Sequence, residues 1–104
     1  MARLDEETEG SLQAGIRPVL IVSNDKANEH SPVITVIPIT SRLEKKKLPT
    51  HVYVQNCGLK KTSVILGEQI LSIDQSRLSH RIGSIKETVY EERVKRAIRI
   101  QLNL

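Results

Sequence analysis

Short runs of β-branched apolar residues, each bounded by turn-forming residues, most restrict how this chain can fold. The clearest run is Val-Leu-Ile-Val at residues 19–22, which follows Arg17-Pro18 and ends in a polar turn at residues 23–25. A continuous apolar run of this length predicts a strand that is buried on both faces. Proline restricts the residue before it to an extended backbone, so the backbone of Arg17 should be extended at the start of this strand.

The chain contains five more segments of the same kind. Strands are predicted where β-branched residues recur between turn residues, at residues 33–39, 51–55, 63–66, 69–73 and 78–85. Pro38 near the end of its strand indicates a bulge or an edge position, and Gly67 permits a kink between two short strands. Residues 26–31 are predicted to form a polar loop.

The two ends of the chain differ from this pattern. Residues 1–10 are acidic, have no apolar period and are predicted to form a mobile arm or a short helical turn. Apolar residues recur at helical spacing within residues 86–102, which predicts one long helix there. Ser84 and Glu87 match the S-x-x-E pattern of a helix cap just before it. Short strands followed by one helix favour a small twisted barrel or a curled antiparallel sheet over a parallel α/β fold.

Length, charge and cysteine content limit the class of protein. The 104 residues suffice for one domain, and a net charge of +4 with a pI of about 9.5 suits a partner that carries phosphates or carboxylates. The lone Cys57 cannot form an intramolecular disulfide, which favours a reducing compartment. No run of about 18 apolar residues is present, so no membrane span is expected. The three histidines lie far apart and no C-x-x-C occurs, so neither a metal site nor a cofactor is predicted.

An arginine and a threonine at two strand ends could form an anion site. Arg17 presents a planar fork of donors that fits a phosphate, and the Thr40 hydroxyl can donate to a second phosphate oxygen. Donors held where negative charge develops can stabilise a phosphoryl transition state. Two basic patches, at residues 45–47 and 60–61, would attract the same kind of ligand or remain solvated. The residues alone leave another interpretation open, in which Arg17 pairs with a carboxylate and Thr40 only ends a strand.

Several motifs in the right order resemble the MazF/PemK family of toxins. The sequence GSLQAGIRPVLIVSND at residues 10–25 is similar to the family signature G-S-E-Q-x-G-x-R-P followed by four apolar residues. The resemblance continues through PITS at residues 38–41 and LGEQI at residues 66–70, and covers roughly residues 10–104. It implies a mainly β fold, an SH3-like β-barrel of the MazF/CcdB type with a C-terminal α-helix, formed by residues 1–104 as a single domain.

The same resemblance implies an activity and the residues that carry it. Family members are toxins of type II toxin–antitoxin modules and metal-independent endoribonucleases that cut single-stranded RNA at short sequences. Arg17 and Thr40 fall on the catalytic pair: the ribose 2′-hydroxyl attacks the adjacent phosphorus, and the products carry a 2′,3′-cyclic phosphate and a 5′-hydroxyl. Arg17 would stabilise the phosphate charge, and Thr40 would hold a non-bridging oxygen. The positions that match the RNA groove and the base-reading surface are Ser11, Gln13, Ser41, Leu48, Pro49, Glu68 and Gln69.

The implied partners follow from the same resemblance. They are single-stranded RNA, a cognate antitoxin whose acidic segment would occupy the same basic groove, and a second copy of the chain in a homodimer. The implied location is the bacterial cytoplasm, with no cofactor and no membrane. RNA affinity in such a groove should fall steeply as salt is added, because phosphate contacts release counterions.

Two departures from the family pattern leave other functions open. Residues 1–9 lack the G-D-[IV]-[WYF] strand motif, so the first family strand is expected to be missing or replaced. Leu12 stands where the family has a glutamate that could transfer a proton. One alternative is therefore a weakened or inactive binding module on the same fold. Another is a gyrase-directed toxin of the CcdB kind, although such toxins end in a tryptophan-containing tail and this chain has no tryptophan.

Replacing Leu12 by glutamate separates a ribonuclease from a binding module. Because a carboxylate can transfer a proton and leucine cannot, we expect Leu12→Glu to cleave single-stranded RNA about tenfold faster or more. The measurement is the initial rate on a mixed-sequence RNA in EDTA, beside a Leu12→Gln control that lacks a titratable group. If the native chain does not cleave and the glutamate variant is unchanged from it, the binding module is favoured.

Overall fold

The computed structural model describes residues 3–8, 16–43 and 47–104. Within them the elements follow in the order β1 (Arg3–Thr8), β2 (Ile16–Ile21), α1 (Asp25–His30), β3 (Val33–Thr40), β4 (His51–Val54), β5 (Ser63–Leu66), the 3-10 turn η1 (Gly67–Gln69), β6 (Leu71–Asp74), the 3-10 turn η2 (Gln75–Arg77), β7 (Leu78–Gly83) and α2 (Val89–Leu102). The predicted site residues Ser11 and Gln13, and the substituted position Leu12, lie outside the described residues.

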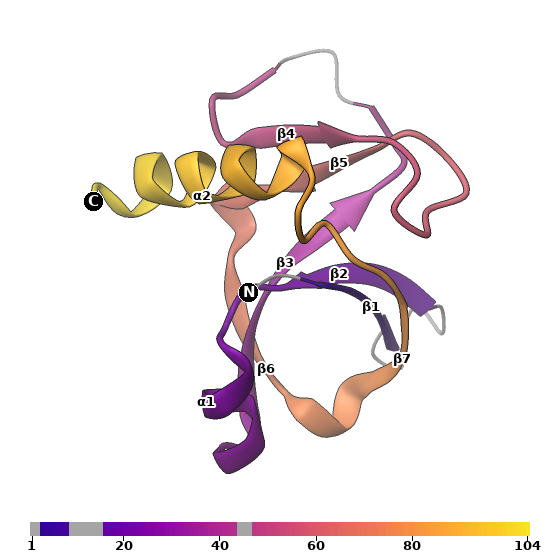
Figure 1. Ribbon diagram of the computed structural model, residues 1–104, viewed down its shortest axis with the longest axis vertical. Coiled ribbons are helices and arrows are strands. Elements are labelled where there is room, and N and C mark those ends of the chain that lie inside the picture. The colour runs from indigo at the N-terminus through magenta and orange to yellow at the C-terminus, as the bar shows by residue number, and fades with distance from the viewer. Residues whose placement is uncertain (1–2, 9–15, 44–46) are drawn as a thin grey trace.

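The described strands form one antiparallel sheet that curls strongly (Figure 1). The strand order is β4-β5-β3-β2-β1-β7, and β6 pairs with the first half of β3. In Figure 1, α2 lies beside β4 and β5 at one end of the molecule, while β6, β7 and α1 lie at the other. The prediction of a mainly β fold with a C-terminal helix is therefore confirmed. Among the described residues, no helix is long and apolar enough to cross a membrane.

The acidic N-terminal segment is a strand, so the prediction of an arm or helical turn was wrong. β1 pairs with β2 from Arg3 opposite Ile21 to Thr8 opposite Ile16. On its other side β1 pairs with β7, with shifts in register. Two neighbouring strands thus satisfy the backbone of a segment whose sequence lacks an apolar alternation, because strand preference depends strongly on the surrounding sheet. The edge of β2 that a missing first strand would have left open is occupied by β1.

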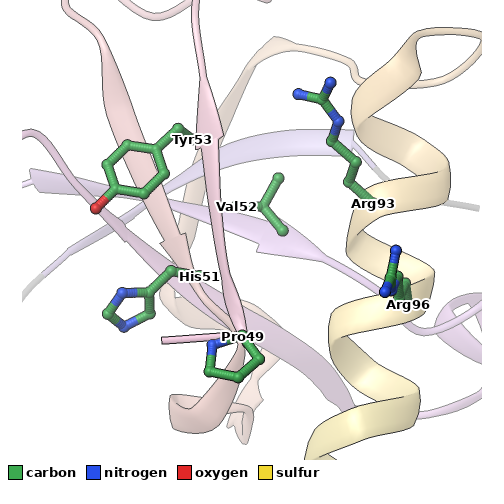
Figure 2. Close-up of a pocket in the computed structure, with 6 residues that line it drawn as sticks. All are labelled: Pro49, His51, Val52, Tyr53, Arg93 and Arg96. Atoms are coloured by element: carbon green, nitrogen blue, oxygen red, sulfur yellow. The ribbon is translucent and has the colours of Figure 1, made fainter. Parts of the chain in front are cut away.

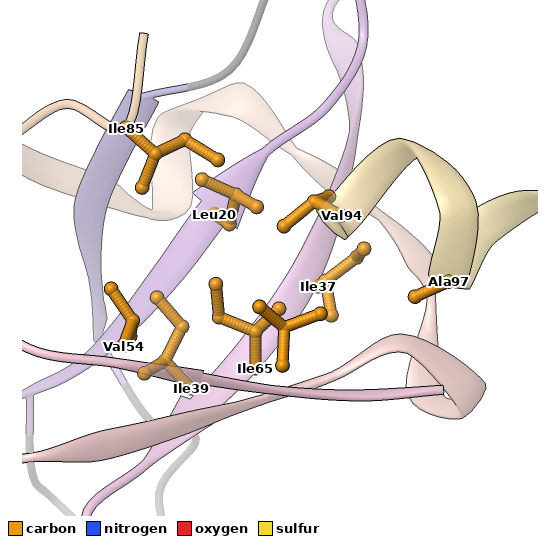
Figure 3. Close-up of a cluster of buried hydrophobic side chains, with 9 residues drawn as sticks. Leu20, Ile37, Ile39, Val54, Ile65, Ile85, Val94 and Ala97 are labelled. Carbon is orange, nitrogen blue, oxygen red and sulfur yellow. The ribbon is translucent and has the colours of Figure 1, made fainter. Parts of the chain in front are cut away.

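The apolar strand β2 is buried on both faces, as its sequence predicts. Leu20 belongs to a cluster that lies between the sheet and α2 and includes Val94 and Ala97 (Figure 3). Val19 and Ile21 point to the opposite face. There they join a second cluster with Ile34, Val36 and Ile73. Alternate residues of β2 therefore pack into two apolar clusters, one on each face of the sheet.

Pro38 lies inside the sheet, so an edge position was wrong. It pairs with Val19 of β2 on one side. On the other side, β3 pairs with β6 as far as Val36 and with β5 from Ile39 onward. Proline has no N–H to offer a ladder. Pro38 therefore stands where β3 passes from one partner strand to the next, which is where a missing donor costs least.

Residues 26–31 were predicted to be a polar loop, which was wrong, because Asp25–His30 form the short helix α1. Asn28 is buried and binds Ser23, two residues before the helix: its Oδ1 accepts from Ser23 Oγ at 2.6 Å, and its Nδ2 donates to the Ser23 carbonyl. Gln75 donates to the Asn28 carbonyl from 47 residues further along the chain. Polar bonds, rather than an apolar face, hold this turn, so apolar periodicity could not reveal it.

The C-terminal helix is confirmed, but it begins later than predicted and with another cap. Thr88 is the N-cap, and its hydroxyl accepts from the Tyr90 N–H at 3.2 Å. Ser84 instead accepts from the Lys86 N–H, and Glu87 has a left-handed φ of 65°. The S-x-x-E match therefore belongs to the turn before the helix.

Two glycines allow the loop after β4 to lie directly against β7. A Cβ on Gly58 would lie 1.8 Å from the Ile82 carbonyl oxygen, and one on Gly83 would lie 1.8 Å from that of Cys57. Gly58 also has a φ of +93°, which favours glycine. Backbone thus touches backbone, and this contact fixes the loop.

Gly83→Ala should lower the free energy of unfolding by about 2 kcal/mol or more, because the Cys57 carbonyl is backbone and cannot rotate away. Urea denaturation measures this loss. Val89→Ala is the control, since Val89 is 58% exposed and should change stability by less than about 0.5 kcal/mol. Equal stability of the two variants would contradict the contact.

Candidate functional site

The register of β2 and β3 bears on where the two predicted catalytic residues lie. Val19 is opposite Pro38 in this antiparallel pair. The same register, continued two residues beyond this last pair, would put Arg17 opposite Thr40. Directly opposed residues point to the same face, with Cβ atoms about 5 Å apart. The geometry therefore supports a shared site for Arg17 and Thr40 at the end of both strands.

The two side chains differ in how they are held. Arg17 is exposed and Thr40 is half-buried. Thr40 Oγ1 accepts a hydrogen bond from the Arg42 N–H at 3.1 Å. This bond uses a lone pair of the oxygen, so the hydroxyl proton can still be donated to a ligand. An arginine fork beside an oriented hydroxyl can bind two oxygens of one phosphate.

A cavity of about 310 Å³ lies at the same end of the strands. It begins at the immediate neighbours of the predicted pair, Pro18 and Ser41, and its other side is the loop that contains Lys60 and Lys61. In the sequence, these lysines stand out only as a basic patch. Their place beside Ser41 depends on the folding of the loop against β7. The residues that line the cavity are Pro18, Ser41, Gly58, Leu59, Lys60, Lys61, Ser63 and Ile82.

The predicted base-reading residues gather at a second place. The Gly67 N–H donates to the Thr50 carbonyl at 3.0 Å, which joins the start of β4 to the turn η1. Leu48, Pro49 and Gln69 are exposed around this junction. Four of the predicted residues, Leu48, Pro49, Glu68 and Gln69, are therefore brought together here.

The Glu68 carboxylate joins the turn η1 to the start of β4 through hydrogen bonds. Thr50 Oγ1 donates to Oε1 at 3.0 Å, and His51 Nε2 lies 3.0 Å from Oε2. The Leu48 N–H points at His51 Nδ1. Nδ1 is then the acceptor, which assigns the proton to Nε2 for donation to Glu68. Both oxygens of Glu68 are thus engaged within the chain.

These contacts also change the acidity of Glu68. Partial burial on its own would raise its pKa. Hydrogen bonds from its own backbone N–H, from His51 and from Thr50 outweigh this and hold the pKa of Glu68 below its ordinary value. The carboxylate is therefore ionised at neutral pH and acts as an acceptor.

A second cavity, of about 290 Å³, lies between β4 and α2 (Figure 2). Figure 2 shows Val52 directed toward the helix, and His51 and Tyr53 on the other side of the strand. Arg93 and Arg96 extend from α2 and make one side of the cavity basic. This cavity includes Pro49, so it adjoins the predicted base-reading residues.

The predicted site residues thus form two groups rather than one. Thr40 is opposite Val64 on one side of β5, and His51 is opposite Leu66 on its other side. Two strand spacings and two residues of strand separate Thr40 from His51 by roughly 12 Å on a flat sheet. A ligand that contacts both groups must therefore extend along the surface, as a strand of nucleic acid does.

Comparison with known proteins decides the family. A family model described as a PemK-like, MazF-like toxin of type II toxin–antitoxin systems matches residues 1–102. The chain belongs to this family. It is 44% identical over 98 residues to an endoribonuclease MazF from Staphylococcus saprophyticus, covering 92% of this chain and 81% of that protein.

Solved structures of MazF toxins have the same fold. The toxin MazF-mt6 of Mycobacterium tuberculosis matches with a TM-score of 0.82 and 26% identity, covering 98% of this chain and 97% of that one. MazF from a MazE–MazF structure of Deinococcus radiodurans matches with a TM-score of 0.81 and 22% identity, covering 98% and 92%. The curled sheet with its C-terminal helix is therefore the fold of MazF toxins.

Glu68→Gln should destabilise the fold in a pH-dependent way. A carboxylate with a lowered pKa in the folded state stabilises the fold fully above its ordinary pKa of 4.5, and this contribution is lost as the pH falls through the folded-state value. We expect a loss of about 1 kcal/mol at pH 7 that shrinks below pH 4.5. Denaturation across pH measures it.

Glu92→Gln is the matched control for this substitution. The Glu92 side chain is 74% exposed and lies 3.6 Å from Lys95, so its removal should cost less than about 0.5 kcal/mol. The assigned role of the carboxylate would be contradicted if the stability lost in Glu68→Gln stayed constant down to about pH 3. That pH is about 1.5 units below the ordinary pKa of glutamate.

Proposed function

We propose that this toxin cleaves single-stranded RNA without a metal ion, using Arg17 and Thr40 as the catalytic pair. The chain is an endoribonuclease of the MazF kind, by its family and by its 44% identical relative. The observation that supports the finer proposal is the register of β2 and β3, which, continued two residues beyond the pair Val19–Pro38, would set Arg17 opposite Thr40 on one face.

In the proposed reaction, the ribose 2′-oxygen bonds to the adjacent phosphorus while the bond from phosphorus to the 5′-oxygen breaks. The 2′-hydroxyl loses its proton and the leaving 5′-oxygen gains one. Negative charge develops on the non-bridging oxygens, where the Arg17 fork and the Thr40 hydroxyl can donate to it. Such donors stabilise the transition state most when their positions are fixed beforehand. Pro18 and the Arg42 N–H provide this restraint.

The surface around Leu48, Pro49 and Gln69 is proposed to read bases. These residues are exposed, and the Glu68 carboxylate orders the backbone beside them. Ser41, next to Thr40, is proposed to bind the RNA near the scissile phosphate. Ser11 and Gln13 keep the same assignment on the family resemblance alone. Glu68 itself would act mainly by positioning, because its oxygens already accept bonds from Thr50 and His51.

A cognate antitoxin is the protein partner, as the family implies. One structural neighbour is an endoribonuclease in complex with its cognate antitoxin from a mycobacterial species. We propose that an acidic segment of the antitoxin competes with RNA for the basic surface. A homodimer, a single domain over residues 1–104 and a bacterial cytoplasmic location complete the proposal.

The catalytic assignment is tested by cleavage of a mixed-sequence single-stranded RNA in EDTA. The native chain should give fragments with 2′,3′-cyclic phosphate and 5′-hydroxyl ends. Arg17→Ala should reduce the rate by about 100-fold or more, because a donor to the developing charge is removed. Thr40→Val, which keeps the shape and removes the hydroxyl, should reduce it by about tenfold or more.

Two controls make the result specific. Arg99→Ala removes an exposed arginine from the last turn of α2 and should leave the rate unchanged. Arg17→Lys keeps the charge without the planar fork and should remain well below the native rate. Native-rate cleavage by Arg17→Ala would reject the proposed pair. A folded native chain that binds RNA and never cleaves it would support the binding-module alternative.

A further inference from the structure

The cavity beside Pro18 and Ser41 has the chemical make-up of a nucleotide site. Leu59 and Ile82 supply apolar surface, while Lys60 and Lys61 supply positive charge. None of the described residues that line it carries a carboxylate that would neutralise the lysines. Its volume of about 310 Å³ is at the small end of the range for ligand sites, which suits one nucleotide unit rather than a larger molecule.

The loop that carries the lysines is held at several points. The Leu59 N–H closes a tight turn onto the Asn56 carbonyl at 2.9 Å. Gly58 is locked against the backbone of β7. Buried Ser63 donates from Oγ to the Lys61 carbonyl at 2.9 Å. A restrained backbone lowers the entropy lost when the lysines engage a ligand.

The position of the cavity relates it to the proposed catalytic pair. Pro18 and Ser41 are bonded directly to Arg17 and Thr40, so the two sites meet at one end of β2 and β3. Successive residues of a strand point to opposite faces. The cavity therefore opens on the other face of this strand end from Arg17. One chain that binds both must pass over the end of the strands.

We infer that this cavity is a subsite for a nucleotide that flanks the scissile phosphodiester, with the base against Leu59 and Ile82 and the phosphate on Lys60 and Lys61. The inference rests on the proposed function, because it assigns a second binding position on the same RNA. Flexible single-stranded RNA can turn over the strand end, whereas a stiff duplex cannot. The subsite would add affinity and leave the chemical step to Arg17 and Thr40.

The test uses the native chain and the double variant Lys60→Ala/Lys61→Ala on a single-site RNA chosen from the mapped cleavage products. We expect KM to rise about tenfold with kcat within about twofold. The slope of log affinity against log salt should fall by about 0.7 for each phosphate that the lysines no longer neutralise. Binding is measured separately with the same RNA carrying a 2′-deoxy nucleotide at the scissile position, which removes the attacking hydroxyl.

Shortening the RNA by single nucleotides from each end locates the subsite. The native chain should lose affinity when the flanking nucleotide is removed from one end. On that shortened RNA, the native chain and the double variant Lys60→Ala/Lys61→Ala should have the same affinity. The control Lys26→Ala/Lys95→Ala removes the same charge from α1 and α2, outside the cavity, and should retain the native KM.

The outcomes distinguish this inference from the proposed function. Equal KM and analogue affinity in the two double variants would overturn the subsite while leaving cleavage intact. A weakened Lys60→Ala/Lys61→Ala variant that differs from native by the same factor on every shortened RNA would also overturn it, because the lysines would then act only through general charge. A native chain that neither cleaves RNA nor binds the analogue would reject the proposed function and the subsite together.

Discussion

The pairing of β2 with β3 is the interaction on which the rest of the structure depends. Both strands are central in the curled sheet, and their alternate side chains enter two separate apolar clusters. A slip of one residue would turn one strand over relative to the other, so Leu20 and Val19 would each face the wrong cluster. The same register that fills both clusters, continued to the strand ends, would set Arg17 opposite Thr40. Stability and the proposed chemistry are thus fixed by one ladder.

Polar contacts then shape the surfaces that the sheet presents. Glu68 gathers Thr50 and His51 at the start of β4, where Leu48 and Pro49 stay exposed. Its lowered pKa and its two engaged oxygens indicate a positioning role for an ionised carboxylate. The proposed base-reading surface is therefore ordered by a side chain whose own capacity to accept bonds is largely used within the fold.

Close backbone contact plays the corresponding part at the other end of β5. Gly58 and Gly83 let the loop after β4 touch β7, and the tight turn at Cys57 brings Lys60 and Lys61 beside Ser41. A basic, partly apolar cavity results next to the proposed catalytic pair. The two surfaces lie far enough apart that an extended single strand, rather than a compact ligand, fits both.

The sequence by itself determined the strands and the C-terminal helix, because β-branched runs and helical spacing are local signals. It also indicated Arg17 and Thr40, since proline and a strand end restrict them locally. Only the tertiary structure decided the strand at Arg3–Thr8 and the helix at Asp25–His30. The first depends on backbone pairing with β2 and β7, and the second on bonds that reach from Ser23 to Gln75. Contacts between distant segments leave no periodic trace in the sequence, so both segments looked like polar connections.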